Sequence, residues 1–99
     1  MRGHYILEGH KAVETDLMTW ANWLENHHDR HVKDETIGES RISTVFLGLD
    51  HQFGDGPPLI FETMVFGGPL DMEQERYATW EEAEIGHMAM VARVQMSNG

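Results

Sequence analysis

Residues 43–66, STVFLGLDHQFGDGPPLIFETMVF, decide the fold. Two short apolar runs, rich in β-branched and aromatic residues, flank a loop rich in Gly and Pro, and this pattern predicts two neighbouring strands of one sheet. Residues 45–49 are almost continuously apolar, so we expect a central strand covered on both faces. Within this run, Gly48 indicates either a bulge or the close approach of another backbone.

The segments upstream of this stretch predict further strands. Residues 32–37 mix polar and apolar side chains as an exposed edge strand does, and Gly38 occupies the first central position of a two-residue type II′ turn. Residues 41–49 then return antiparallel. Residues 5–7 and 11–13 predict a short initial hairpin. Residues 70–77, downstream, are expected to be a polar connection that crosses the sheet.

Two helices are expected. The first carries an apolar stripe with helical spacing and is capped by Thr15 or Asp16; the stripe consists of Leu17, Trp20, Ala21 and Leu24. The second begins at the capping box of residues 79–82, TWEE. Its sheet-facing stripe consists of Trp80, Ala83, His87, Met90, Val91 and Val94.

The second helix is also apolar on its opposite side, and a helix with two apolar faces in a small protein predicts a second burial surface. We interpret it as a homo-oligomer interface, most simply that of a dimer. The interface would consist of Ile85, Met88, Ala89 and Ala92.

Taken together, these elements predict one α+β domain over residues 1–99, with a small antiparallel sheet of three to five strands packed with two helices. The meander at its centre is expected to have three strands. Most aromatic side chains are expected to fill the core; these are Trp20, Trp23, Trp80, Phe46, Phe53 and Phe66, with contact to a ligand or partner as the alternative for Phe53, which lies in a loop.

The composition excludes several classes of function. Seventeen acidic residues against seven basic ones give a net charge of −10, which opposes direct nucleic-acid binding and contact with anionic membranes. The acidic excess either keeps the protein soluble or engages a basic protein partner. The absence of cysteine excludes disulfides, thiolate zinc sites and a Cys nucleophile. Residues 1–5 lack the apolar core of a signal peptide and no run is long enough to span a bilayer, so we expect a cytoplasmic protein.

Glu62 is the most unusual residue, because strand alternation places it on one face with Ile60, Met64 and Phe66. A buried carboxylate must be paired, hydrogen-bonded or bound to a metal. One interpretation is an ion pair with Arg41 or Arg76, or a hydrogen bond from a Trp indole.

The other interpretation of Glu62 is catalytic. Asp50 and His51 end the preceding strand, and His87 lies on the sheet-facing stripe of the second helix. If these three converge with Glu62, the set suits a divalent metal or general acid–base chemistry, as in a small metal-dependent hydrolase. Otherwise His87 is a hydrogen-bonded core histidine, Asp50 and His51 shape a loop, and no cofactor is bound.

A cluster of histidines follows the first helix. His27 and His31 would share one face if the helix continued, which suits a metal. The apolar stripe stops at Leu24, however, and histidines at a helix C-terminus also interact with its free carbonyls.

STVFLGLDHQFGDGPPLIFETMVFGG followed by ERYATWEEAEIGHMAMV resembles a family of short uncharacterised proteins of tailed bacteriophages and prophages. The resemblance covers about residues 41–94, with a looser likeness over residues 16–25. It implies a small acidic accessory protein made by a phage in the cytoplasm of its bacterial host.

This resemblance implies a first hypothesis of stoichiometric binding without turnover. The ligand would be a host protein, such as a defence protein, or a small signalling nucleotide that is sequestered. Phe53 in the loop, with Arg41 and Arg76 as cations, would contact it. Alternatives are the metal-dependent hydrolase and a virion or assembly component.

Overall fold

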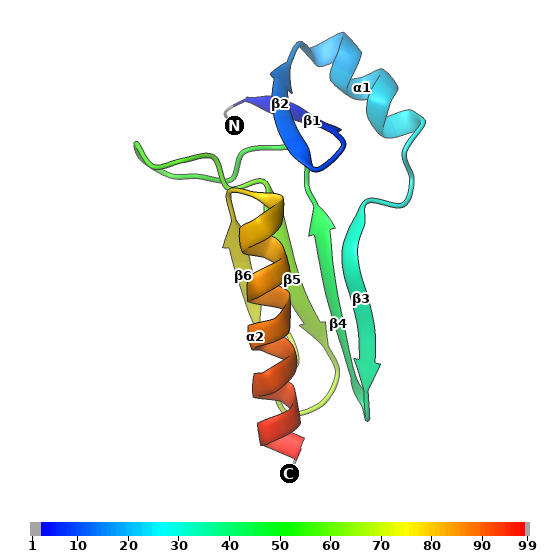
Figure 1. The fold of residues 1–99 in the computed structure, drawn as a ribbon, viewed down its shortest axis with the longest axis vertical. Helices are drawn as coiled ribbons and strands as arrows, with labels where there is room; N and C mark the ends of the chain where they lie inside the picture. Colours follow the sequence, from blue (N-terminus) through cyan, green and yellow to red (C-terminus); the bar gives the residue numbers. More distant parts are fainter. Residues whose placement is uncertain (1–2, 99) are drawn as a thin grey trace.

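The computed structural model describes residues 3–98, which form an α+β fold (Figure 1). Met1 and Arg2, part of the segment predicted not to be a signal peptide, lie outside the described residues. The predicted α+β class and two helices are confirmed, and the strands form two antiparallel sheets instead of the single sheet expected. In chain order the elements are β1 His4–Glu8, β2 Lys11–Thr15, α1 Leu17–Glu25, β3 His31–Ile37, β4 Ser40–Phe46, β5 Phe61–Phe66, β6 Gln74–Tyr77 and α2 Trp80–Asn98.

The larger sheet is a four-stranded meander in the order β3-β4-β5-β6, with β4 and β5 at its centre. The prediction that residues 70–77 only connect elements was wrong, because Gln74–Tyr77 pairs with β5 from Met64 to Phe61. This strand lies at the sheet edge, where polar residues are tolerated, so QERY lacks the apolar pattern by which strands are recognised.

Several local predictions about turns and caps are confirmed. Asp16 caps α1, and its carboxylate accepts a hydrogen bond from the backbone N–H of Thr19 at 2.8 Å. Gly38 has a φ of 59° in the turn between β3 and β4, as a type II′ turn requires at that position. Gly48 marks a close backbone approach, since its carbonyl accepts a hydrogen bond from the Tyr5 N–H at 2.8 Å.

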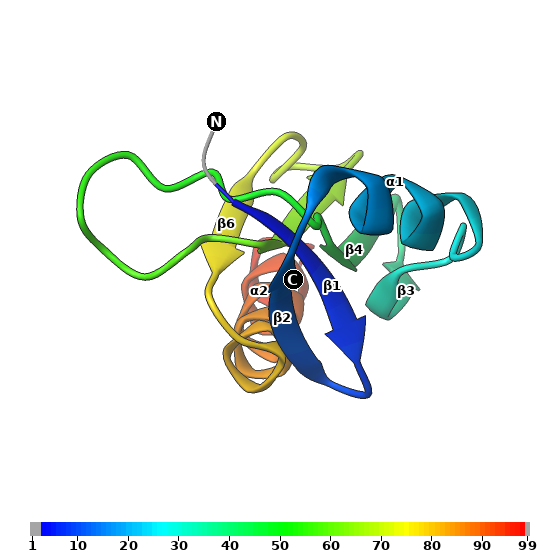
Figure 2. The same cartoon turned by 90° about the horizontal axis from the view of Figure 1, so that it is seen from above.

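α2 packs along one face of the four-stranded sheet (Figures 1 and 2). Its predicted stripe is confirmed: Ala83, His87, Met90, Val91 and Val94 are buried. The stripe packs on alternate residues of the two central strands, because side chains two apart in a strand share a face. These strand residues are Ile42, Thr44, Phe46, Phe61, Thr63 and Val65.

The opposite face of the sheet corrects the expectation that both faces are covered. α1 packs on β1 instead of on this face. Val45 and Met64, which point away from α2, are half-buried, and Phe66 is 44% exposed where a core position was expected. The apolar run of β4 therefore reflects one face packed by α2 and one face that is partly open.

The β1–β2 hairpin and α1 close one end of the molecule, above the N-terminal end of α2 (Figure 1). Leu7 and Ala12 of the hairpin pack against a core cluster that contains Phe46, Phe61 and Ala83. Trp20 of α1 donates its indole N–H to the Gly48 carbonyl at 3.0 Å, which ties α1 to the end of β4. Of the residues that the structure describes, neither helix combines the length and apolar character needed to cross a membrane.

Candidate functional site

The structure does not bring the four proposed catalytic residues together. Glu62 points to the open face of the sheet, whereas His87 lies under α2 on the other face. Asp50 shapes a loop, because its Oδ1 accepts hydrogen bonds from the N–H groups of Gln52 at 2.8 Å and Leu59 at 3.0 Å. These residues therefore do not form one site in this structure, because β-strand alternation separates Glu62 and His87 by the thickness of the sheet.

The structural interpretation of Glu62 is supported instead. Arg76 Nε donates to Glu62 Oε2 at 3.0 Å across the β5–β6 pair, and the Glu62 side chain is only 15% exposed. Arg41 is engaged elsewhere, since it donates two hydrogen bonds to Asp34. This arginine lowers the pKa of the Asp34 carboxyl.

The three residues proposed to bind a ligand do not share a site. Arg41 pairs with Phe66 and Arg76 with Glu62 in the register of the sheet, so the two arginines lie four residues apart along β5. Phe53 projects from the loop between β4 and β5 and is 93% exposed. A shared cationic pocket for these residues is therefore not formed within this chain.

Beneath α2, a hydrogen-bonded chain of side chains crosses the sheet. His87 Nε2 contacts Glu35 Oε1 at 2.7 Å, and its Nδ1 contacts Thr44 Oγ1 at 2.7 Å. Thr44 and Thr63 join their hydroxyl groups at 2.5 Å, and the Tyr77 hydroxyl donates to Thr63 at 3.1 Å. His87, Thr44 and Thr63 are all completely buried. The chain thus links all four strands to α2.

The chemistry of these groups sets the direction of the two outer bonds. A carboxylate only accepts, so Nε2 of His87 carries the hydrogen towards Glu35. At the other end, the Tyr77 hydroxyl donates to Thr63. Between them, the Thr44 hydroxyl is able to donate or accept towards both Nδ1 of His87 and the Thr63 hydroxyl. Each buried group has a partner, as low-dielectric surroundings demand. Burial raises the pKa of the Tyr77 hydroxyl, in accordance with its role as a donor.

This network resembles a carboxylate–imidazole–hydroxyl relay, but Thr44 is 0% exposed and no substrate reaches it in this conformation. We therefore assign it to fold specification rather than to catalysis. Glu35, Thr44 and Thr63 were not identified from the sequence. The sequence does contain a clue, because each apolar run holds one threonine, Thr44 and Thr63, at a position that faces the core. Buried hydroxyl groups require hydrogen-bond partners.

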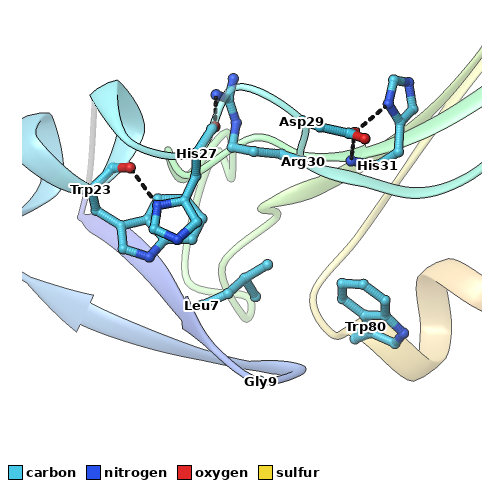
Figure 3. Close-up of a pocket in the computed structure, with 8 residues that line it drawn as sticks. All are labelled: Leu7, Gly9, Trp23, His27, Asp29, Arg30, His31 and Trp80. Carbon is cyan, nitrogen blue, oxygen red and sulfur yellow. Dashed lines mark hydrogen bonds and ion pairs between the residues drawn. The ribbon is translucent and has the colours of Figure 1, made fainter.

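The clearest concave site is a pocket of about 280 Å³ between the hairpin, the end of α1 and the start of α2. Trp23 and Trp80 stand on opposite sides of it, and Leu7 lies between them (Figure 3). Trp23 also packs edge-on against Phe46. These indoles were expected to be core, yet each is half-buried and lines the pocket.

The pocket also collects cationic and imidazole groups, which are few in this acidic chain. Arg30 lies on its rim, where Nε and Nη1 donate to the Phe46 and His27 carbonyls at 3.3 and 3.0 Å. His27 stacks on Trp23 with ring centroids 4.2 Å apart. Its Nδ1 donates to the Trp23 carbonyl at 2.7 Å, so Nε2 is the nitrogen left for other partners.

His31 and Asp29 complete the rim and hold each other. The backbone N–H of His31 donates to Asp29 at 3.1 Å and the ring contacts the same oxygen at 2.9 Å. The hydrogen bond from the His31 backbone N–H is the main cause of a lowered pKa of the Asp29 carboxyl, and the bond from the His31 ring lowers this pKa further. His27 thus contacts a carbonyl at the end of α1, whereas His31 contacts Asp29 in the loop and Ser43 of β4. Among residues 3–98, no group of three or more histidine and carboxylate side chains is arranged to hold a metal ion.

A second, more open cavity of about 420 Å³ lies between β6, α2 and the loop before β5. Leu59, Tyr77 and Ile85 contribute to its lining. The Tyr77 ring lies directly over Gly86, where any side chain would overlap it. The cavity is also lined by the cationic side chain of Arg76, which is already paired with Glu62. This cavity therefore offers an apolar surface more than a polar recognition site.

The acidic side chains do not gather on one element. Exposed carboxylates occur on β1, β2, β3, β6 and α2, for example Glu8, Glu14, Asp34, Glu75 and Glu81. This distribution supports the interpretation that the charge serves solubility.

Comparison of the chain with protein-family models, with curated proteins and with solved structures finds no match.

Proposed function

We propose that this protein is a phage-type accessory protein that works stoichiometrically, by binding and sequestering a small nucleotide in the pocket between Trp23 and Trp80. The observation that supports this proposal is that two indole side chains line the pocket while Arg30 and His27 lie on its rim. Aromatic faces stack on bases, while guanidinium and imidazole groups attract phosphate. This is the lining that a planar anion needs, and it occurs in a chain with a net charge of −10.

The cellular context of the proposal comes from the resemblance to phage and prophage proteins. A protein of this kind acts in the cytoplasm of the infected bacterium, where signalling nucleotides control defence. His87, which contacts the Thr44 hydroxyl, is completely buried away from the pocket, whereas His31 on the rim contacts the Ser43 hydroxyl at 3.1 Å. Recovery of the ligand intact is therefore the test of binding without turnover.

The experiment is a titration of tryptophan fluorescence with AMP, cyclic AMP and cyclic di-GMP, followed by mass spectrometry of the recovered nucleotide. We expect one of them to change the fluorescence at a fixed stoichiometry and to be recovered intact. Hydrolysis of the nucleotide would reject sequestration. Absence of binding by all three, together with no nucleotide-sized adduct in native mass spectra of protein isolated from bacteria, would reject the nucleotide.

A pair of matched variants locates the site. Arg30→Gln removes the rim guanidinium, and a lost charged hydrogen bond corresponds to a roughly tenfold or greater loss of affinity. Arg41→Gln makes the same change on the open face of the sheet, outside the pocket. We expect only the first to weaken binding, with both variants checked for folding by circular dichroism. Equal losses would place the ligand elsewhere.

A host protein is the second candidate partner, and it is favoured by the apolar side chains that the structure leaves exposed. Ile85 and Met88 on the outer face of α2 are 72% and 56% exposed, and Phe53 is 93% exposed.

Together with Ala89 and Ala92, Ile85 and Met88 form the proposed homo-oligomer interface. Light scattering coupled to size exclusion tests it: Met88→Ser should lower the mass, whereas Met18→Ser, also exposed but on α1, should not.

A further inference from the structure

The β1–β2 hairpin is attached to the rest of the protein at its root and along its strands. At the root, Tyr5 N–H donates to the Gly48 carbonyl at 2.8 Å, and His4 forms a β-bridge with Leu49. Further along, the paired residues Leu7 and Ala12 pack against the core cluster. The two strands form a sheet of their own, separate from the four-stranded sheet. The strands are therefore held as far as Leu7 and Ala12, and only the turn beyond this pair, residues 8–11, extends past the core packing.

The turn of this hairpin borders the pocket. Gly9 contributes to the lining, and Figure 3 shows it below Leu7, between the Trp23 and Trp80 sides. Gly9 has a φ of 63°, and a Cβ added there would meet nothing within 4 Å. The turn is thus loosely surrounded, although it forms one wall of the site.

A single stacked pair holds the turn to α2. The His10 imidazole lies flat on the Trp80 indole, with ring centroids 3.9 Å apart and an interplanar angle of 6°. Within residues 3–98, no hydrogen bond is described between residues 9–10 and any other element. Trp80 is itself a pocket wall, so this stack joins the wall to the turn.

We propose that the Gly9-His10 turn is a lid over the pocket and that the stack of His10 on Trp80 is its latch. The assignment of the enclosed ligand as a nucleotide rests on the proposed function, whereas the latch does not. With the latch closed, the turn and both indoles surround the ligand. Release of the stack lets the turn move away from Trp80 and opens the site.

Hydrogen exchange of the free protein tests the latch without any ligand. An aromatic pair contributes enough that its loss should speed exchange of the amides of residues 8–12 roughly two- to tenfold in His10→Ala. His10→Phe keeps a flat ring and should restore slow exchange. His28→Ala changes an exposed histidine outside the pocket lining and should have no effect on these amides. Equal exchange in His10→Ala and His28→Ala would overturn the latch.

AMP serves as the probe for the lid. In stopped-flow displacement, His10→Ala should release AMP several-fold faster than the wild type, and His10→Phe should not. Unchanged release, with AMP bound, would overturn the lid even if the exchange result holds. If the wild type binds none of AMP, cyclic AMP and cyclic di-GMP while the exchange of residues 8–12 still depends on His10, the latch stands and the proposed nucleotide fails.

Discussion

Replacing Thr44 by Val tests the network under α2. The two side chains have nearly the same shape, so the change removes one hydroxyl from a completely buried position and little else. That hydroxyl contacts His87 Nδ1 at 2.7 Å and Thr63 Oγ1 at 2.5 Å. The variant therefore leaves Nδ1 of His87 and the Thr63 hydroxyl each without one hydrogen-bond partner.

The expected cost follows from these two groups. Each buried polar group left without a partner costs about 1–3 kcal/mol, and the apolar methyl gained by Val returns up to about 1 kcal/mol. For two such groups the net loss should be about 1–6 kcal/mol of the free energy of unfolding. For a domain of this size each 1 kcal/mol lost corresponds to a decrease in Tm of roughly 4–8 °C.

Thermal and urea unfolding followed by circular dichroism measure the loss. Thr36→Val is the matched control, because Thr36 is an exposed residue of β3 for which no side-chain hydrogen bond is described in residues 3–98. We expect the control to change the free energy of unfolding by less than about 0.5 kcal/mol. If Thr44→Val is no more destabilising than the control, the network does not contribute as argued.

Three other predictions follow from single contacts. Gly86→Ala should destabilise the protein even though Ala favours helices, because the new methyl group overlaps the Tyr77 ring; thermal unfolding measures it. The raised pKa of Tyr77 implies stability that is fully present below the ordinary tyrosine pKa and lost as pH rises through the folded value. Tyr77→Phe should therefore flatten the alkaline part of a stability profile. Asp16 has a lowered pKa because of the Thr19 N–H, so its contribution is present above the ordinary value and lost as pH falls through the folded one. Asp16→Asn keeps a capping oxygen and should reduce the acid sensitivity of unfolding.

The elements with strong local patterns were predictable. The α2 stripe from Ala83 to Val94 repeats with helical spacing, so its buried face follows from the sequence alone. Asp16 and Gly38 act through their own backbone geometry, and both were identified. β6 was missed because its existence depends on hydrogen bonds to β5 and not on any property of QERY itself.

The candidate sites show the limit of the same reasoning. Alternation along β5 correctly places Glu62 with Met64 and Phe66, but the prediction was wrong for Ile60, which precedes the strand and is buried in the core cluster with Phe46 and Ala83. It does not say which face of the sheet α2 covers, and this choice separated Glu62 from His87. The partner of His87 is Glu35, which lies 52 positions away in the sequence, on the edge strand β3. The pocket likewise draws Leu7, Trp23 and Trp80 from three distant segments.

The sequence by itself determined the α+β class, the central strand pair, the two helices and the buried face of α2, because side-chain period and turn chemistry act over a few residues. Only the tertiary structure decided the fourth strand, the open sheet face, the polar network and the indole pocket. Each of these depends on which distant surfaces meet when apolar area is buried, and that is a property of the whole chain rather than of any segment.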